Sequence, residues 1–115
     1  PPLGDDDRFH PKTVVMGART PEGAVAFPKD SLRERHLVDG SLAGEAVLGV
    51  YDPRLDTGYV YRNPDGRSFE QDDGEAVADD GTRYAAADLP LDRVHAFDAM
   101  WFAWSGFYPE TSVHE

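Results

Sequence analysis

Short runs of apolar residues alternate with turn residues along most of the chain, which is the pattern of antiparallel β-strands joined by hairpins. Residues 13–19 and 24–27 are two such runs, and Thr-Pro-Glu-Gly at positions 20–23 separates them. Pro at the second and Gly at the fourth position of that turn favour a type I β-turn. The segment from residue 13 to residue 27 therefore predicts a β-hairpin.

Residues 45–51 form the most continuously apolar run of the chain. Such a run predicts a central strand that is covered on both faces, and the Asp52-Pro53 pair that follows ends the strand. Farther on, Asn-Pro-Asp-Gly at 63–66 predicts a hairpin between residues 58–62 and 67–71. Turn residues continue to recur at short intervals after this point, so we expect an antiparallel meander.

A different spacing governs the last part of the chain. Phe97, Trp101, Trp104 and Tyr108 recur at helical intervals. An adjacent apolar stripe widens this arc: Met100, Ala103 and Phe107. An apolar arc this wide is typical of a buried helix rather than a surface helix. The spacing predicts a helix over residues 96–108 that closes the core of the sheet.

These elements predict an α+β fold that is mainly antiparallel β-sheet, in hairpins and a meander, closed by one short buried C-terminal aromatic helix. The 115 residues are the length of one domain. We expect residues 1–12 to be a flexible segment and residues 13–115 to be a single compact domain. No apolar run approaches the roughly 18 residues of a membrane span, so we expect no membrane insertion. The first residues lack the basic start and apolar stretch of a signal peptide, and the compartment is left open.

The charge of the chain is strongly acidic. Asp and Glu number 22 against 11 Lys and Arg, which gives a net charge of −11, and the only lysines are Lys12 and Lys29. Short hydrated carboxylates in place of lysines suit a protein that works where salt screens charge, so we expect a high-salt environment. The same charge argues against binding to nucleic acid, whose phosphates require a basic patch, and against anionic membrane surfaces.

The chain contains no cysteine. Disulfides, thiolate catalysis, zinc–thiolate sites and iron–sulfur clusters are therefore excluded for these residues.

Several segments follow one another as they do in the family of domains of unknown function numbered 3179, which has many haloarchaeal and bacterial members. They lie at 9–17, 24–28, 37–44, 46–53 and 97–111. The most specific match is the set near the C-terminal end: Trp101, Trp104, Pro109 and Thr111. The chain resembles this family from about Phe9 to Val113, as a cysteine-free branch of haloarchaeal type.

The chain departs from the family pattern at one single residue and at one triplet. Many relatives carry a cysteine where this chain has Asp52, and many carry a Trp-His-Glu triplet where it has Glu34, Arg35 and His36. If relatives build a metal or redox site on that histidine and cysteine, this chain lacks the sulfur ligand, and its imidazole is displaced by one residue. The resemblance therefore transfers no catalytic, cofactor or metal residue to this chain.

Three residues remain as candidate binding positions: Asp52, His36 and Arg62. Asp52 and His36 are the residue types of a general acid–base pair, but no serine or cysteine nucleophile is adjacent to either in sequence. An Asp before Pro at the end of a strand is also ordinary turn chemistry. An exposed aromatic side chain in a cleft beside any of the three would favour ligand binding.

The sequence predicts no metal or cofactor. The Asp-Asp-Gly turns at 72–74 and 79–81 lack the spacing of a calcium-binding loop. The four histidines are far apart, without the close pairs of a zinc motif.

Two hypotheses for function follow. The first is a non-catalytic binding or assembly module, which docks to another protein domain or to a copy of itself. The second is a ligand- or metal-binding domain with redox or hydrolytic activity in relatives, degenerate here. Solvent-inaccessible Trp101 and Trp104 without a cleft beside them would favour the first.

Overall fold

The computed structural model describes residues 7–115 as three β-sheets and two short α-helices. The sequence predicts a flexible segment over residues 1–12, and residues 1–6 of that segment lie outside the described range. Within residues 7–12, Phe9 packs edge-on against Trp101 with ring centroids 5.2 Å apart, and the carbonyl of Pro11 accepts a 2.9 Å hydrogen bond from the amide of Phe102. These two contacts tie this part of the N-terminal segment to the C-terminal helix.

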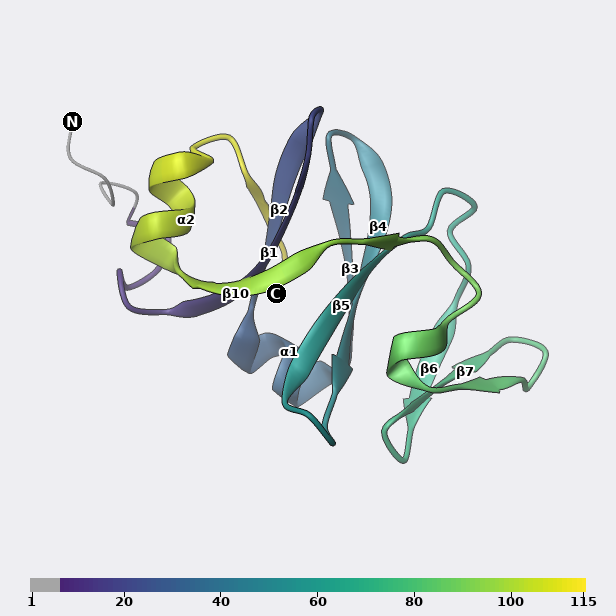
Figure 1. Ribbon diagram of the computed structural model, residues 1–115. Helices are drawn as coiled ribbons and strands as arrows, with labels where there is room; N and C mark the ends of the chain where they lie inside the picture. Colours follow the sequence, from purple (N-terminus) through teal and green to yellow (C-terminus); the bar gives the residue numbers. More distant parts are fainter. Residues whose placement is uncertain (1–6) are drawn as a thin grey trace.

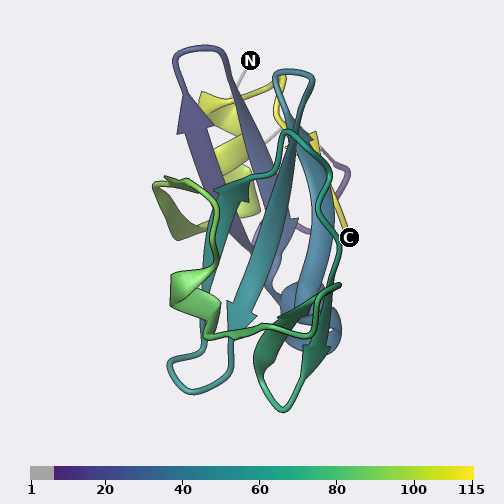
Figure 2. The same cartoon turned by 90° about the vertical axis from the view of Figure 1, so that its right-hand side faces the viewer.

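Two four-stranded sheets face each other (Figures 1 and 2). Sheet A has the order β10-β1-β2-β11: β10 (Ala96–Met100), β1 (Val14–Thr20), β2 (Gly23–Pro28) and β11 (Ser112–Val113). Sheet B has the order β3-β4-β5-β9: β3 (Leu37–Leu42), β4 (Glu45–Asp52), β5 (Thr57–Arg62) and β9 (Arg93–Val94). All neighbours in these sheets are antiparallel except β11, which pairs with β2 in parallel.

A third sheet and three helical segments complete the fold (Figure 1). Sheet C has the order β6-β7-β8: β6 (Phe69–Asp72), β7 (Glu75–Ala78) and β8 (Arg83–Tyr84). The helical segments are α1 (Lys29–Arg35), the 3₁₀ turn η1 (Ala86–Asp88) and α2 (Trp101–Phe107). Neither α-helix in the described range is long and apolar enough to cross a membrane.

The alternation of side chains along the strands divides the apolar residues into three clusters. Met16 and Phe27 point from sheet A toward sheet B, where they join α1 and β3–β5 in the central core. Val15 and Ala26 point the other way, against Trp101 and Trp104 of α2. On the outer face of sheet B, β4 and β5 pack against β7 and η1. The layers are therefore α2, sheet A, sheet B, and finally sheet C with η1, as Figure 1 shows from left to right.

The α+β class, the predominance of antiparallel strands and the C-terminal helix are confirmed. The hairpin predicted over residues 13–27 is β1–β2, and the continuously apolar run 45–51 is β4, which has strands on both sides and packed layers on both faces.

The predicted start of the C-terminal helix at residue 96 is wrong, because α2 begins at Trp101. Residues 96–100 instead form β10, which pairs with β1 from Ala18↔Ala96 to Val14↔Met100. The backbone hydrogen bonds that β1 offers favour the strand over the helical spacing. Phe97 still packs on Trp104, but from the strand, with centroids 5.6 Å apart. Phe107, expected in the apolar stripe, is 70% exposed.

The predicted hairpin between residues 58–62 and 67–71 is also wrong. Asn63 does make a turn, since its side chain accepts a 2.9 Å hydrogen bond from the amide of Arg67 and donates to the Arg67 carbonyl at 3.0 Å. After this turn, however, β6 leaves sheet B and pairs with β7. The edge of β5 that β6 would have taken is paired with β9.

Candidate functional site

The three candidate residues from the sequence lie at two ends of sheet B. Leu37 pairs with Val50, so His36 before β3 and Asp52 at the end of β4 lie at the same end of the sheet. Arg62 pairs with Val47, near the start of β4, and therefore lies at the opposite end. The structure does not bring Arg62 together with the other two residues.

Asp52 is a buried carboxylate with one unpaired oxygen. Its residue is 2% exposed, and its Oδ1 accepts a 3.0 Å hydrogen bond from the amide of Arg54 and lies 3.6 Å from Arg54 Nε. Within residues 7–115, Oδ2 has no hydrogen-bond partner. The Arg54 amide bond is the one expected of an Asp that begins a turn, so the geometry supports the structural interpretation of Asp52.

The His36 ring does not contact the Asp52 side chain. Its ring lies 5.5 Å from the ring of Tyr51, and Tyr51 points into the central core between sheets A and B. Successive residues of a strand point to opposite faces, so the Asp52 side chain points away from Tyr51 and from this ring. His36 also has φ 66°, an uncommon conformation for a residue with a Cβ. No general acid–base pair forms between these two candidates.

A hydrogen-bonded network near His36 has a structural role. The Tyr51 hydroxyl donates to Asp56 Oδ1, while Arg33 donates from Nε to Oδ1 at 3.0 Å and from Nη2 to Oδ2 at 2.9 Å. The Arg33 guanidinium, followed by the Tyr51 hydroxyl, holds the pKa of Asp56 well below its usual value. The hydrogen bond to Asp56 and then burial raise the pKa of Tyr51. This network fastens the β4–β5 turn to α1.

Arg62 lies beside an open groove. Its Nη1 is 3.4 Å from Glu45 Oε2, and both side chains line a cavity of about 180 Å³ together with Thr20 and Glu22. Thr20 and Glu22 also line a larger groove of about 670 Å³. Arg62 is thus the one candidate residue from the sequence that borders this groove, although it is not part of its lining.

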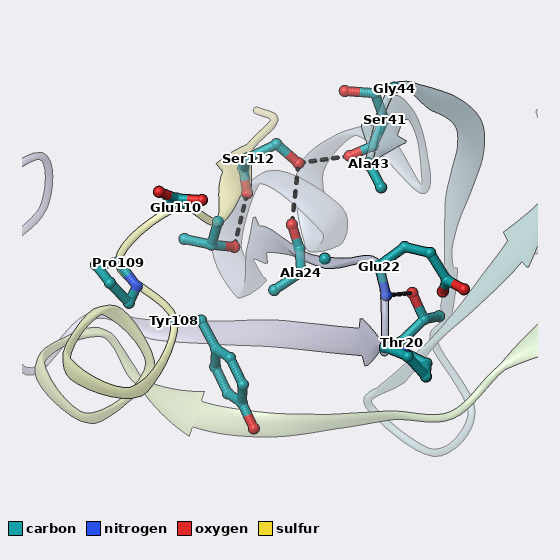
Figure 3. A pocket seen from close by; sticks show the side chains of 13 residues that line it. Thr20, Glu22, Ala24, Ser41, Ala43, Gly44, Tyr108, Pro109, Glu110 and Ser112 are labelled. Atoms are coloured by element: carbon teal, nitrogen blue, oxygen red, sulfur yellow. Dashed lines mark hydrogen bonds between the residues drawn. The ribbon is translucent and has the colours of Figure 1, made fainter.

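Three segments that are distant in sequence form the groove (Figure 3). They are the β1–β2 turn with residues 20–24, the β3–β4 turn with Ser41 and residues 43–44, and the segment 108–112 after α2. Figure 3 shows residues 108–110 on one side, Thr20 and Glu22 on the other, and Ser41 and Ser112 at the end where the two sheets meet. The volume lies in the range of typical ligand-binding sites.

Hydrogen bonds fix these segments relative to one another. The Ser112 hydroxyl is within hydrogen-bond distance of the Ala24 carbonyl, at 3.4 Å, and also donates to the Ser41 carbonyl, so it links both sheets. Trp104 Nε1 donates to Thr111 Oγ1 at 3.0 Å, which anchors the third segment to α2. The groove is therefore held in shape by the fold before any ligand arrives.

The groove has an acidic lining. Glu22 and Glu110 are the charged side chains among its 13 residues, and both are exposed. Tyr108 forms part of one wall, where its ring lies 4.4 Å from the ring of Trp104 and 5.9 Å from the guanidinium carbon of Arg19. The two carboxylates can only accept hydrogen bonds, whereas the carbonyls of Ala24, Ser41 and Thr111 already lie within hydrogen-bond distance of Ser112 or Arg8.

Sequence reasoning missed this groove. The turn at 20–23 was recognisable, and Pro109 and Thr111 belong to the motif that resembles the family, whereas residues 39–42 lie in β3 and only residues 43–44 make the β3–β4 turn. Nothing in the sequence indicated that the three segments converge, because their convergence depends on β11 joining β2 in parallel beside β3.

Within the described part of the chain, no group of three or more His, Asp or Glu side chains is arranged to hold a metal ion.

A comparison with known protein families identifies the family of the chain. Residues 1–111 match the family model described as "Protein of unknown function (DUF3179)", and the chain belongs to this family. No curated protein and no solved structure matches the chain. The resemblance stated from the sequence is thereby confirmed at the level of the family.

Proposed function

We propose that this chain is a non-catalytic binding module that docks a cationic segment of another protein in the groove between the β1–β2 turn, the β3–β4 turn and residues 108–112. The observation that carries the proposal is the groove itself, about 670 Å³ in volume and built from three segments that hydrogen bonds hold in place. A site that is already formed loses less conformational entropy on binding than one that must be ordered.

Charge supports a cationic occupant. The charged side chains of the lining are Glu22 and Glu110, and the whole chain carries a net charge of −11. Such a field attracts cations and repels anions over distances set by the ionic strength. Lysine and arginine side chains supply several hydrogen-bond donors each, which complements the acceptor-only carboxylates of Glu22 and Glu110.

Exposed apolar side chains favour a second candidate, assembly with another copy of the chain. Five of the six exposed large apolar residues in the described range lie at the start of β1, in β10 and in α2: Val14, Phe97, Met100, Phe102 and Phe107. Exposed apolar side chains on neighbouring elements contribute to interaction surfaces, although strand alternation places Val14 and Met100 on the opposite face of sheet A from Phe97. Sedimentation of the protein across a concentration series tests this candidate, and a monomer at all concentrations rejects it.

The docking proposal predicts selective binding of basic peptides. Two peptides of equal length, one rich in Lys and Arg and one rich in Asp and Glu, are titrated while the indole N–H resonances are followed by NMR. We expect the basic peptide alone to shift the Trp104 resonance, because Trp104 Nε1 donates to Thr111 in the groove wall.

A matched pair of double variants separates the groove from general charge. Glu22→Gln with Glu110→Gln removes both carboxylates of the lining and should weaken binding roughly fivefold or more, as expected for two exposed ion pairs. Glu70→Gln with Asp79→Asn removes the same charge from exposed positions outside the lining and should change binding much less. Equal losses in the two pairs, or no binding of the basic peptide, would refute the proposal.

We further propose that the acidic composition adapts the protein to high salt. The excess of 22 acidic over 11 basic residues makes the folded surface repel itself when ionic strength is low. The melting temperature should therefore rise from dilute buffer to molar KCl as the Debye length falls from about 30 Å to about 3 Å. Removing the charges of Asp65, Glu70 and Asp79 should flatten this rise, and a melting temperature independent of KCl would contradict the proposal.

A further inference from the structure

The imidazole of His114 joins the two facing sheets near the groove. His114 follows β11, and its backbone amide donates to the Ala26 carbonyl in β2 at 3.1 Å. Its ring lies 6.0 Å from the ring of Phe27 and rests on Gly40 in β3, where an added Cβ would be 2.8 Å from His114 Cδ2. The backbone of His114 thus contacts sheet A, while its ring also contacts sheet B.

The hydrogen bond that the ring makes fixes its protonation state. The backbone amide of Ser41 donates to His114 Nε2 at 3.0 Å. A backbone N–H can only donate, so Nε2 must offer its lone pair, and the ring must be neutral with its proton on Nδ1. The Ser41 hydroxyl lies 3.4 Å from the same nitrogen.

We propose that the hydrogen bond from the Ser41 amide to His114 Nε2 is a pH-sensitive clasp. It holds the C-terminal segment to β3 while the ring is neutral, and it is released when the ring is protonated. Protonation places an N–H on Nε2 opposite the Ser41 N–H, so the hydrogen bond is lost and two donors face each other. The bond is therefore present while the ring is neutral and is lost when the ring is protonated.

In the part of the chain that the structure describes, no charged side chain hydrogen-bonds to the His114 ring. Asp39 lies in β3 and is exposed, and Lys29, which follows β2, is ion-paired with Asp98 at 2.5 Å. Arg35 in α1 donates from Nη1 to the backbone carbonyl of Glu115 at 2.6 Å. Within residues 7–115, the side-chain hydrogen bonds of His114 are with Ser41 alone.

The clasp also bears on the groove, and this part of the inference rests on the proposed function. Ser41 lines the groove, and its carbonyl accepts a hydrogen bond from Ser112 on the facing segment. When His114 releases the Ser41 amide, one of the links between these two sides of the groove is lost. Acid should therefore weaken binding of a basic peptide in the groove.

Hydrogen exchange at the Ser41 amide tests the clasp without any ligand. His114→Gln is the matched variant, because the glutamine oxygen accepts a hydrogen bond and does not titrate. At about pH 8 the exchange rates of wild type and His114→Gln should be similar, and at about pH 5 the wild type should exchange roughly two- to tenfold faster, the loss of one ordinary hydrogen bond. His114→Phe keeps a ring on Gly40 without an acceptor and should exchange faster than His114→Gln at both values.

Three outcomes would overturn the clasp. The ¹⁵N shifts of the imidazole at neutral pH could show Nε2 protonated, the ratio of exchange rates could stay constant with pH, or His95→Gln could abolish the pH effect as His114→Gln does. Failure of the basic peptide to bind at any pH would refute the groove proposal alone, because hydrogen exchange at Ser41 is measured on the unliganded protein.

Discussion

Replacing Trp104 with Ala should lower the free energy of unfolding by about 3–5 kcal/mol, a large part of the total stability of a domain this size. The Trp104 side chain is 2% exposed and packs from α2 onto the outer face of sheet A. Its ring contacts Phe97 and Tyr108, and its Nε1 donates to Thr111 Oγ1 at 3.0 Å. The substitution leaves a cavity and removes the partner of a buried hydroxyl, and both effects destabilise the fold.

Urea denaturation followed by far-ultraviolet circular dichroism measures this change. Phe102→Ala is the matched control, because Phe102 lies in the same helix and is 40% exposed. We expect the control to lose well under half as much stability as Trp104→Ala, since burial sets the transfer and cavity costs. Equal stability of the two variants would show that α2 does not pack on sheet A as described.

Local sequence signals predicted the elements whose stability is local. The β1–β2 hairpin has a turn at 20–23 whose residue types suit its backbone, and β4 has an apolar run that only a doubly covered strand can bury. Trp101 and Trp104 were expected to be buried, and their exposed fractions are 0% and 2%. In each case the residues that carry the signal also form the structure.

The errors arose where a distant strand competes with a local preference. Residues 96–100 have helical spacing, yet β1 offers them an unpaired edge, and β10 forms. Residues 67–71 follow a good turn, yet β9 occupies the edge of β5 that a hairpin would need. A local sequence pattern cannot predict pairing between distant segments. Such pairing overrides local propensity.

The candidate site shows the same limit. Asp52 and His36 are close in the sheet, but strand alternation directs Asp52 away from Tyr51, on whose ring His36 packs. The groove depends on β11 returning to β2 beside β3, and Ser41 and Ser112 are separated by 71 positions. Nothing in the sequence of an ordinary turn indicates which hydroxyl and carbonyl groups will lie close together in the fold.

Gly17 is a position where the fold requires the absence of a side chain. A Cβ built on Gly17 would lie 2.5 Å from Cη2 and Cζ3 and 2.6 Å from Cζ2 of Trp104. Real Cβ atoms essentially never approach other atoms so closely. Trp104 is held by α2 and by its hydrogen bond to Thr111, so the ring cannot move aside without separating the helix from sheet A.

Gly17→Ala should therefore destabilise the protein by roughly 1–3 kcal/mol through overpacking, although Ala has the higher intrinsic stability in an unstrained strand. The same substitution in a Trp104→Phe background should cost clearly less, because the smaller ring leaves room for the methyl group, and the double-mutant cycle measures this coupling. Gly23→Ala is the control, since its nearest contact would be 3.2 Å from Ala43 Cβ and a smaller adjustment suffices. Both costs are measured by urea denaturation.

Additive effects of Gly17→Ala and Trp104→Phe would show that the ring does not rest on Gly17, and the packing of α2 on sheet A would then need another explanation.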